Sequence, residues 1–118
     1  MKKAIIIGAS SGIGNSLARI MSARGYTLGL TGRRRNLLDE LGRNLPSPSI
    51  ISDFDIADTD KAMQALQNLI EEMDGVDKII INAGIGHTNP DLNWEVEKLI
   101  FDINIKGFAA MANVAFNY

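Results

Sequence analysis

A glycine-rich turn near the start of the chain has the residue types and spacing of an anion-binding site. Residues 8–14, Gly-Ala-Ser-Ser-Gly-Ile-Gly, lie between an apolar run at 4–7 and an amphipathic stretch at 15–24. A glycine turn between a strand and a helix lets backbone N–H groups approach an anion, and the helix N-terminus adds partial positive charge. The ligand that such a turn predicts is the pyrophosphate of a dinucleotide. Its expected contacts are Gly8, Ser10, Ser11, Gly12, Ile13 and Gly14.

The three glycines of this turn have different expected roles. Gly8 would make the tight turn, Gly12 would let the ligand approach, and Gly14 would let the helix pack closely against the sheet. The spacing differs from the common G-x-G-x-x-G pattern, and the Lys-Ser/Thr that follows the last glycine of a P-loop is missing. Ser10 and Ser11 would donate hydroxyl hydrogen bonds to the ligand or cap the helix.

Strands and helices alternate along the predicted chain. Short apolar runs predict strands at 3–7, 27–31, 49–54 and 78–81. Helical periodicity predicts helices at 15–24, at 37–45, from Asp58 or Thr59 to a closing Gly75, and from Trp94 to the last residue with a bend near Lys106 and Gly107. In the first of these helices, the apolar residues at helical spacing are Ile13, Leu17, Ile20 and Met21. The alternation predicts an α/β fold with a parallel sheet and helices on both faces.

Several polar or small residues follow these strands directly. Gly8, Gly32, Asp55 and Asn82 all lie at or just past the carboxyl end of a predicted strand. Ligands of open parallel sheets bind beyond the carboxyl ends of the strands. We therefore expect these residues to line one edge of the sheet.

Four motifs, in order along nearly the whole chain, resemble the classical short-chain dehydrogenase/reductase family. They are the glycine turn 8–14, the pair Asp55-Ile56, the triplet Asn82-Ala83-Gly84, and Asp-Ile-Asn-Ile-Lys-Gly at 102–107. The resemblance implies a Rossmann-type doubly wound parallel sheet, here incomplete, with the first four strands and their helices. It also implies a nicotinamide cofactor and the oxidation or reduction of an alcohol or carbonyl.

The resemblance also implies roles for individual residues. Asp55 would accept a hydrogen bond from the adenine amino group beside the Ile56 backbone, or would simply be a turn or capping residue. Asn82, followed by Ala83 and Gly84, would tie the fourth strand to its neighbours near the adenosine ribose, or would be a turn residue.

Asn104 would be the family's catalytic asparagine. Because asparagine has poor helix propensity, it would bend its helix and hold a water in a proton relay. The alternative is a helix that ends at Gly107, with Asn104 near the cap.

The end of the second predicted strand bears on the choice of nicotinamide cofactor. In NAD sites an acidic residue there holds the ribose 2′-OH, whereas in NADP sites an arginine accommodates the 2′-phosphate. The chain instead has Gly32, which leaves room where the acid would stand, followed by three arginines at 33–35. A guanidinium binds phosphate through paired, charge-assisted hydrogen bonds. We predict NADP rather than NAD.

The residue that the family uses to bind the 2′-phosphate corresponds to Arg33, which Ser10 or Arg34 would assist. The alternative is a solvated basic patch at a helix start, which the helix dipole disfavours.

A proton donor for carbonyl chemistry is missing from the sequence. The family uses the tyrosine of a Tyr-x-x-x-Lys motif with an upstream serine, and neither Tyr26 nor Tyr118 has a lysine at that spacing. We expect residues 1–118 to be the N-terminal cofactor-binding portion of a single domain, inactive alone and without its C-terminal catalytic and substrate portion.

Two other classes of protein are alternatives to this interpretation. A non-catalytic dinucleotide-binding or sensor module is the main alternative, and a Tyr-x-x-x-Lys motif in the codons that follow would decide between the two. An adenosylmethionine-dependent transferase usually has an acid after the second strand, so Gly32 and Arg33 argue against it.

Composition excludes several partners. The formal net charge of −2 suggests neither nucleic acid nor an anionic membrane as a partner, and the lack of cysteine excludes disulfides and thiolate metal sites. We expect no metal site, and we interpret the single histidine, His87, as a loop residue. The apolar run at 4–7 is too short for a signal peptide, and no stretch approaches a transmembrane span of roughly 20 apolar residues. We therefore expect a cytoplasmic protein that acts on a small-molecule substrate.

The C-terminal segment suggests self-association. Residues 108–118 form a nearly all-round apolar helix, which must bury its faces against something. The strand at 78–81 lacks its expected second neighbour, and open strand edges favour association. We predict a homo-oligomer, or aggregation, through residues 94–118, with Trp94, Leu99, Ile100 and Phe101 in the core or in a subunit contact.

Overall fold

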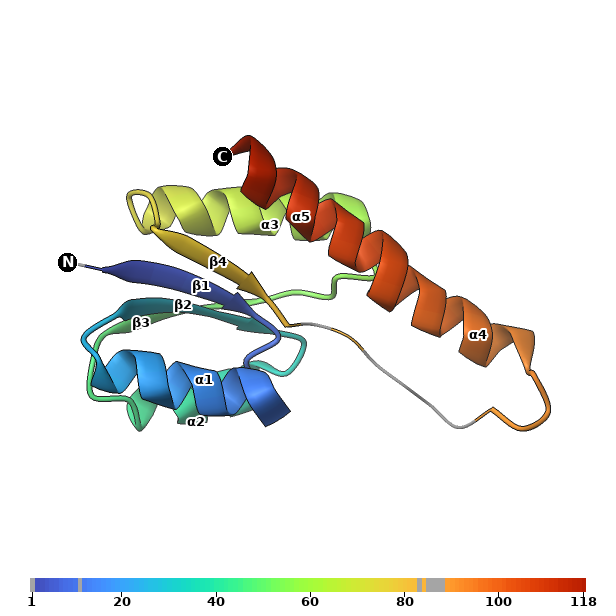
Figure 1. The fold of residues 1–118 in the computed structure, drawn as a ribbon, viewed down its shortest axis with the longest axis horizontal. Coiled ribbons are helices and arrows are strands. Elements are labelled where there is room, and N and C mark those ends of the chain that lie inside the picture. Colours follow the sequence, from blue (N-terminus) through green and yellow to red (C-terminus); the bar gives the residue numbers. More distant parts are fainter. Residues whose placement is uncertain (1, 11, 83, 85–88) are drawn as a thin grey trace.

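The computed structural model describes residues 2–10, 12–82, 84 and 89–118 of the chain. Within these residues, four parallel strands form one sheet in the order β3-β2-β1-β4 (Figure 1). The strands are β1 (Lys3–Ile7), β2 (Thr27–Gly32), β3 (Ser49–Asp53) and β4 (Lys78–Ile81). The strand order reverses direction at β1, so the switch point lies at the carboxyl ends of β1 and β4, where ligands of such sheets bind.

Helices cover both faces of this sheet, as the alternation predicts (Figure 1). One face carries α1 (Gly12–Ala23) and α2 (Arg35–Arg43). The other face carries α3 (Thr59–Glu72) and α5 (Phe108–Asn117). The predicted α/β class with a doubly wound parallel sheet is confirmed.

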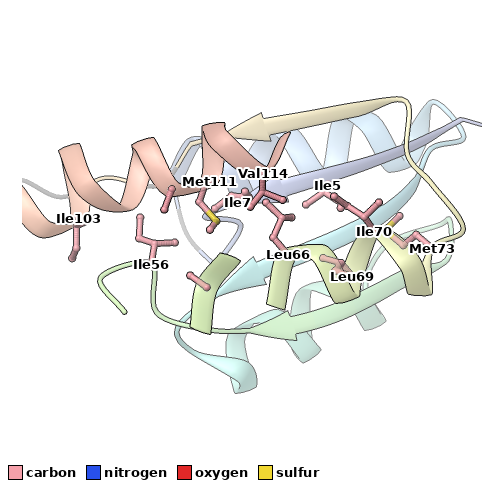
Figure 2. Packing of buried hydrophobic residues seen from close by; sticks show 12 residues of the cluster. Ile5, Ile7, Ile56, Leu66, Leu69, Ile70, Met73, Ile103, Met111 and Val114 are labelled. Atoms are coloured by element: carbon pink, nitrogen blue, oxygen red, sulfur yellow. The ribbon is translucent and has the colours of Figure 1, made fainter. Parts of the chain in front are cut away.

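The central strand β1 is buried on both faces. Ile5 and Ile7 belong to the core under α3 and α5, where Met111 packs beside them (Figure 2). Ala4 and Ile6 point to the opposite core under α1 and α2. Successive side chains of a strand point to opposite faces, so an unbroken aliphatic run is what a doubly covered strand requires.

The first helix begins earlier than predicted and buries only part of its predicted apolar face. α1 starts at Gly12 and buries Gly14, Ala18, Met21 and Ser22. Ile13 and Ile20 are 75% and 52% exposed. A Cβ on Gly14 would overlap the carbonyl oxygen of Gly8, so the helix approaches the sheet along its glycine face. Ile13 and Ile20 therefore turn outward, whereas Leu17 and Met21 pack on the core.

The last helical segment is continuous from Trp94 to Asn117. It consists of α4 (Trp94–Phe101), a π-helical turn η1 (Asp102–Gly107) and α5. Near Lys106 and Gly107, where the sequence predicts a bend, the helix has this π-helical turn, and the alternative of a helix ending at Gly107 is wrong. A Cβ on Gly107 would lie 2.9 Å from both Cγ1 and the backbone oxygen of Ile56, so the glycine allows the close contact there.

This 24-residue run is long and apolar enough to cross a membrane by length and composition, with a mean hydropathy of 1.3 over its best window. The expectation that no stretch approaches such a span is therefore wrong as a statement about length and composition. Its buried face, with Ile103, Met111 and Val114, packs on the core beneath α3, which accounts for that part of its apolar content. Trp94 and Phe101 are 66% and 52% exposed, so they are not core residues.

The strand β4 pairs with β1 alone among the strands that the structure describes. Its other edge is open, as the sequence predicts. A groove of about 370 Å³ runs along this edge between β4 and α5, with Phe116 and Tyr118 on its wall.

Candidate cofactor site

A cleft of about 390 Å³ lies at the carboxyl ends of the strands. Most of the predicted site residues that the structure describes line it: Gly8, Ser10, Gly12, Ile13, Arg33, Arg34, Asp55, Ile56, Asn82 and Gly84. Gly14 and Asn104 do not line it, and Ser11, Ala83 and His87 lie outside the described residues.

The glycine turn is tied to the neighbouring strand through its backbone. The N–H groups of Gly8 and Ala9 both donate to the carbonyl oxygen of Thr31, at 3.1 and 2.8 Å. These two amides are therefore engaged within the protein, and the N–H groups that a ligand would find are those of the first turn of α1. Gly8 and Gly12 have φ angles of 93° and 63°, which explains why the turn needs glycine.

The glycine turn leaves free space beside Gly12 but none beside Gly14. Apart from the adjoining residues and the backbone of α1 itself, no described atom lies within 4 Å of the position that a Cβ on Gly12 would take, so the cleft reaches the backbone at the N-terminus of α1. At Gly14 the same position is blocked by the carbonyl oxygen of Gly8 and, at 2.9 Å, by Nδ2 of Asn82. A pyrophosphate needs this combination of close backbone approach and a fixed helix N-terminus.

Asn82 joins three parts of the site. Its backbone N–H donates to the carbonyl oxygen of Ile7 at 2.9 Å, and its Nδ2 donates to the carbonyl oxygen of Gly8 at 3.4 Å. The residue thereby links the end of β4 to β1 and to the glycine turn. Its contact with a ribose stays a prediction.

The three consecutive arginines have different surroundings. Arg35 donates to the Asp53 carboxylate at 2.9 Å and lies 3.9 Å from that of Asp39. The hydrogen bond to Asp53 raises the pKa of Arg35 above its ordinary value. Arg33 and Arg34 line the cleft, and Arg33 is exposed. Asp53, the last residue of β3, is the ion-pair partner of Arg35.

Asp55 both lines the cleft and forms a turn. Its Oδ1 accepts the N–H of Ala57 at 2.9 Å, and its backbone oxygen accepts the N–H of Asp58 at 3.1 Å. The side chain of Ile56 is only 7% exposed and belongs to the core. The turn holds Asp55 at the rim of the cleft, and a contact with adenine stays a prediction.

Asn104 lies in the π-helical turn η1, beside the cleft rather than in its wall. Its Oδ1 is 3.3 Å from the position that a Cβ on Gly84 would take, so the two residues are neighbours. Single π-helical turns within α-helices are frequent at functional sites.

Four residues that are not among the predicted site residues also line the cleft: Ile7, Thr31, Phe54 and Ile103. Thr31 is fully buried, and its hydroxyl donates to the carbonyl oxygen of Ile6 at 3.3 Å. Phe54 lies just beyond β3 and not within it, because this strand ends at Asp53, one residue earlier than predicted. Only their positions in the sequence could have predicted these residues, since each lies beside a predicted site residue or at a strand end.

Neither tyrosine lines the cleft. Tyr26 lies at the amino ends of the strands, with the ammonium groups of Lys2 and Lys78 each 5.5 Å from its ring centroid. A hydrogen bond with Lys78 lowers the pKa of Tyr26 and raises that of Lys78. Tyr118 accepts the N–H of Val76 at 2.9 Å, in the loop before β4.

This architecture, a parallel sheet with a glycine turn and a cleft at the switch point, is that of a Rossmann-type dinucleotide-binding domain. A family model described as short chain dehydrogenase matches residues 2–118. The chain belongs to this family.

Relatives and solved structures agree with this assignment. An oxidoreductase of Mycobacterium tuberculosis, described as uncharacterized, is 38% identical over 90 residues, which are 72% of this chain and 36% of that protein. The crystal structure of an alcohol dehydrogenase from Thermococcus sibiricus, complexed with 5-hydroxy-NADP, has a TM-score of 0.92 at 24% identity, covering 99% of this chain and 52% of that one. A 3-ketoacyl-(acyl-carrier-protein) reductase from Brucella melitensis, complexed with NADH, has a TM-score of 0.86 at 25% identity, covering 95% and 47%.

The chain is shorter than these relatives. It spans 36% of the M. tuberculosis protein and 47% of a similar oxidoreductase from Staphylococcus epidermidis.

Proposed function

We propose that this chain is the cofactor-binding portion of an NADP-dependent oxidoreductase that acts on an alcohol or carbonyl. The observation that carries the choice of NADP is the end of β2, where Gly32 replaces an acid and Arg33 follows on the cleft. The solved relatives bound to 5-hydroxy-NADP and to NADH support a nicotinamide dinucleotide of either kind. When bound, the nicotinamide supplies or accepts a hydride.

The residues present fit such a cofactor. The open backbone at Gly12 and the N-terminus of α1 suit the pyrophosphate, Asp55 suits the adenine, and Arg33 suits the 2′-phosphate. We assign Asn104 the role of holding a water in a proton relay, beside Gly84 at the rim of the cleft. Because neither Tyr26 nor Tyr118 lines the cleft, we expect no reductase activity from these 118 residues alone.

A non-catalytic dinucleotide-binding module is the second candidate. The absence of both tyrosines from the described lining of the cleft favours it, because a cleft without the family's proton donor can bind a cofactor without turning over a substrate. Carbonyl-dependent oxidation of NADPH by the 118-residue chain would contradict both our expectation of inactivity and this alternative.

We also propose that the protein forms homo-oligomers through residues 94–118. Phe101, Ile105, Phe108 and Phe116 recur at helical spacing and are all exposed, at 52%, 54%, 45% and 91%. Exposed apolar stripes of this kind mark interfaces. A cytoplasmic location stays a prediction from composition.

The cofactor choice is tested by titrating the protein with NADPH and with NADH. We expect NADPH to bind more tightly, and Arg33→Ala to weaken NADPH binding about 10- to 150-fold, the worth of a charge-assisted hydrogen bond, while leaving NADH binding unchanged. Arg24→Ala is the matched control, since Arg24 is exposed just after α1, at the other end of the helix from the cleft. Equal affinities for both cofactors would contradict the assignment.

A further inference from the structure

Ser10 and Gly32 are neighbours in the lining of the cleft. Ser10 lies in the glycine turn, Gly32 is the last residue of β2, and both line the cleft next to Arg33. A Cβ on Gly32 would lie 3.3 Å from both Cβ and Oγ of Ser10, and 3.5 Å from Cδ2 of Leu38. The contact with Ser10 is shorter than the optimal separation of about 3.5–4.0 Å between carbon atoms, so Gly32 cannot gain a side chain without moving a neighbour.

A Cβ at position 32 would require Ser10 to shift by a few tenths of an ångström, whereas Leu38, at 3.5 Å, would make an ordinary contact. The turn that carries Ser10 is fixed to β2 by the two hydrogen bonds from Gly8 and Ala9 to the carbonyl oxygen of Thr31. Leu38 is fully buried in the core under α2. The backbone of Gly32 is not in the left-handed region, and its carbonyl oxygen accepts the N–H of Phe54 at 2.9 Å. A side chain at position 32 is therefore disfavoured by lack of space and not by backbone strain.

We propose that Ser10 is a specificity-determining residue, because it keeps position 32 as glycine and so excludes the carboxylate that an NAD site places there. This inference rests on the proposed function. An acid at the end of β2 holds the ribose 2′-OH of NAD. Selection against one ligand commonly uses a steric or electrostatic obstacle in addition to attraction for the other. Here Arg33 would supply the attraction for the 2′-phosphate, and Ser10 would supply the obstacle to the acid.

The first test measures cofactor binding in Gly32→Asp, Ser10→Gly and the double variant, by calorimetric titration with NADH and NADPH. We expect Gly32→Asp alone to gain less than about threefold in NADH affinity, because the new side chain displaces the turn. The double variant should gain about tenfold or more, as expected for a hydrogen bond to a charged group.

The second test needs no cofactor. Gly32→Ala should lower the midpoint of thermal unfolding, and Ser10→Gly should restore most of that loss in the double variant, because residues in contact couple. Ser16→Gly, an exposed serine on α1, provides the matched control cycle, in which the two effects should add. If Gly32→Ala does not fold, rescue of folding by Ser10→Gly but not by Ser16→Gly gives the same support.

Two results would overturn the inference. They are additive effects of Ser10→Gly and Gly32→Ala on the unfolding midpoint, and an NADH gain for Gly32→Asp alone that equals the gain of the double variant. A wild-type protein that binds NADH as tightly as NADPH would instead overturn the proposed function, and the cofactor-free cycle would still report separately whether Ser10 restricts position 32.

Discussion

The helices α1 and α5 pack on opposite faces of one sheet, and they do so by opposite means (Figure 1). α1 makes its closest contact through Gly14, where the missing side chain lets the helix approach the backbone of Gly8. α5 packs through Met111 and Val114, which are 0% and 5% exposed (Figure 2). A backbone contact fixes the position of a helix more tightly than a contact between flexible side chains, since carbonyl oxygens cannot change rotamer.

The two modes of packing suit different tasks. The close approach of α1 holds the helix N-terminus and the open backbone at Gly12 at the strand ends, where a pyrophosphate would bind. α5 instead fills the core with its inner side chains and exposes the apolar residues Phe108 and Phe116 on its outer side. We therefore expect added atoms at the contact face of α1 to destabilise the fold. In α5, we expect an added charge to destabilise the fold only on the buried side.

The largest expected effect separates the two sides of α5. Met111→Lys would bury a charge among Ile7, Leu66 and Val114, so it should lower the free energy of unfolding by about 3–5 kcal/mol or more, enough to unfold many domains. Phe108→Lys should cost about 1 kcal/mol or less, because Phe108 is partly exposed. Chemical denaturation monitored by circular dichroism measures both.

Phe108→Lys also tests the proposed assembly. If the outer side of α5 forms a subunit contact, Phe108→Lys should shift the protein toward monomer in light scattering while it stays folded. A wild-type protein that is a folded monomer at tens of micromolar, on the order of the concentrations at which interfaces of standard size assemble, would refute the oligomer proposal. Met111→Lys cannot serve this purpose, since its target is a core residue.

The next effect concerns the contact face of α1. Gly14→Ala places a methyl group against the Gly8 carbonyl oxygen, so we expect a loss of about 1–3 kcal/mol in the free energy of unfolding and a loss of NADPH binding. Gly12→Ala is the matched control: space is open there, and the cost should be about 1 kcal/mol, from the positive φ alone. If the two variants were equally stable, the close approach of α1 would not be a constraint on the fold.

The contrast between these helices also explains what the sequence could predict. The order of strands and helices followed from the apolar runs, and the residues at the strand ends met in one cleft because parallel strands share that edge. The role expected for Gly14 predicts the close packing of α1 on the sheet, but the spacing of Ile13 and Ile20 does not predict that these two side chains are exposed. Hydrophobic periodicity identifies a helix, but it misses a face chosen by backbone contact.

The cleft residues, too, could be predicted only in part from the sequence. Arg33 and Asp55 could be placed at the cleft from their positions after strands, but the pairing of Arg35 with Asp53 depends on the register between α2 and β3. The contact between Ser10 and position 32 depends on how the turn is fixed to Thr31. Distances of this kind arise from tertiary packing, which one sequence does not encode locally.

The smallest expected effect lies at the end of α5, where one hydrogen bond ties this helix to the loop between α3 and β4. The Tyr118 hydroxyl accepts the N–H of Val76 at 2.9 Å, and the bond is exposed. Tyr118→Phe should therefore cost about 0.5–1.5 kcal/mol at most, because water can replace the lost partner. The sharper readout is amide hydrogen exchange: protection of Val76 should fall, whereas Asp77, whose N–H donates to the carbonyl oxygen of Lys3 at 2.8 Å, should keep its protection. Equal loss at both amides would mean that Tyr118 holds the whole loop, and α5 would then depend on a specific polar contact as α1 depends on Gly14.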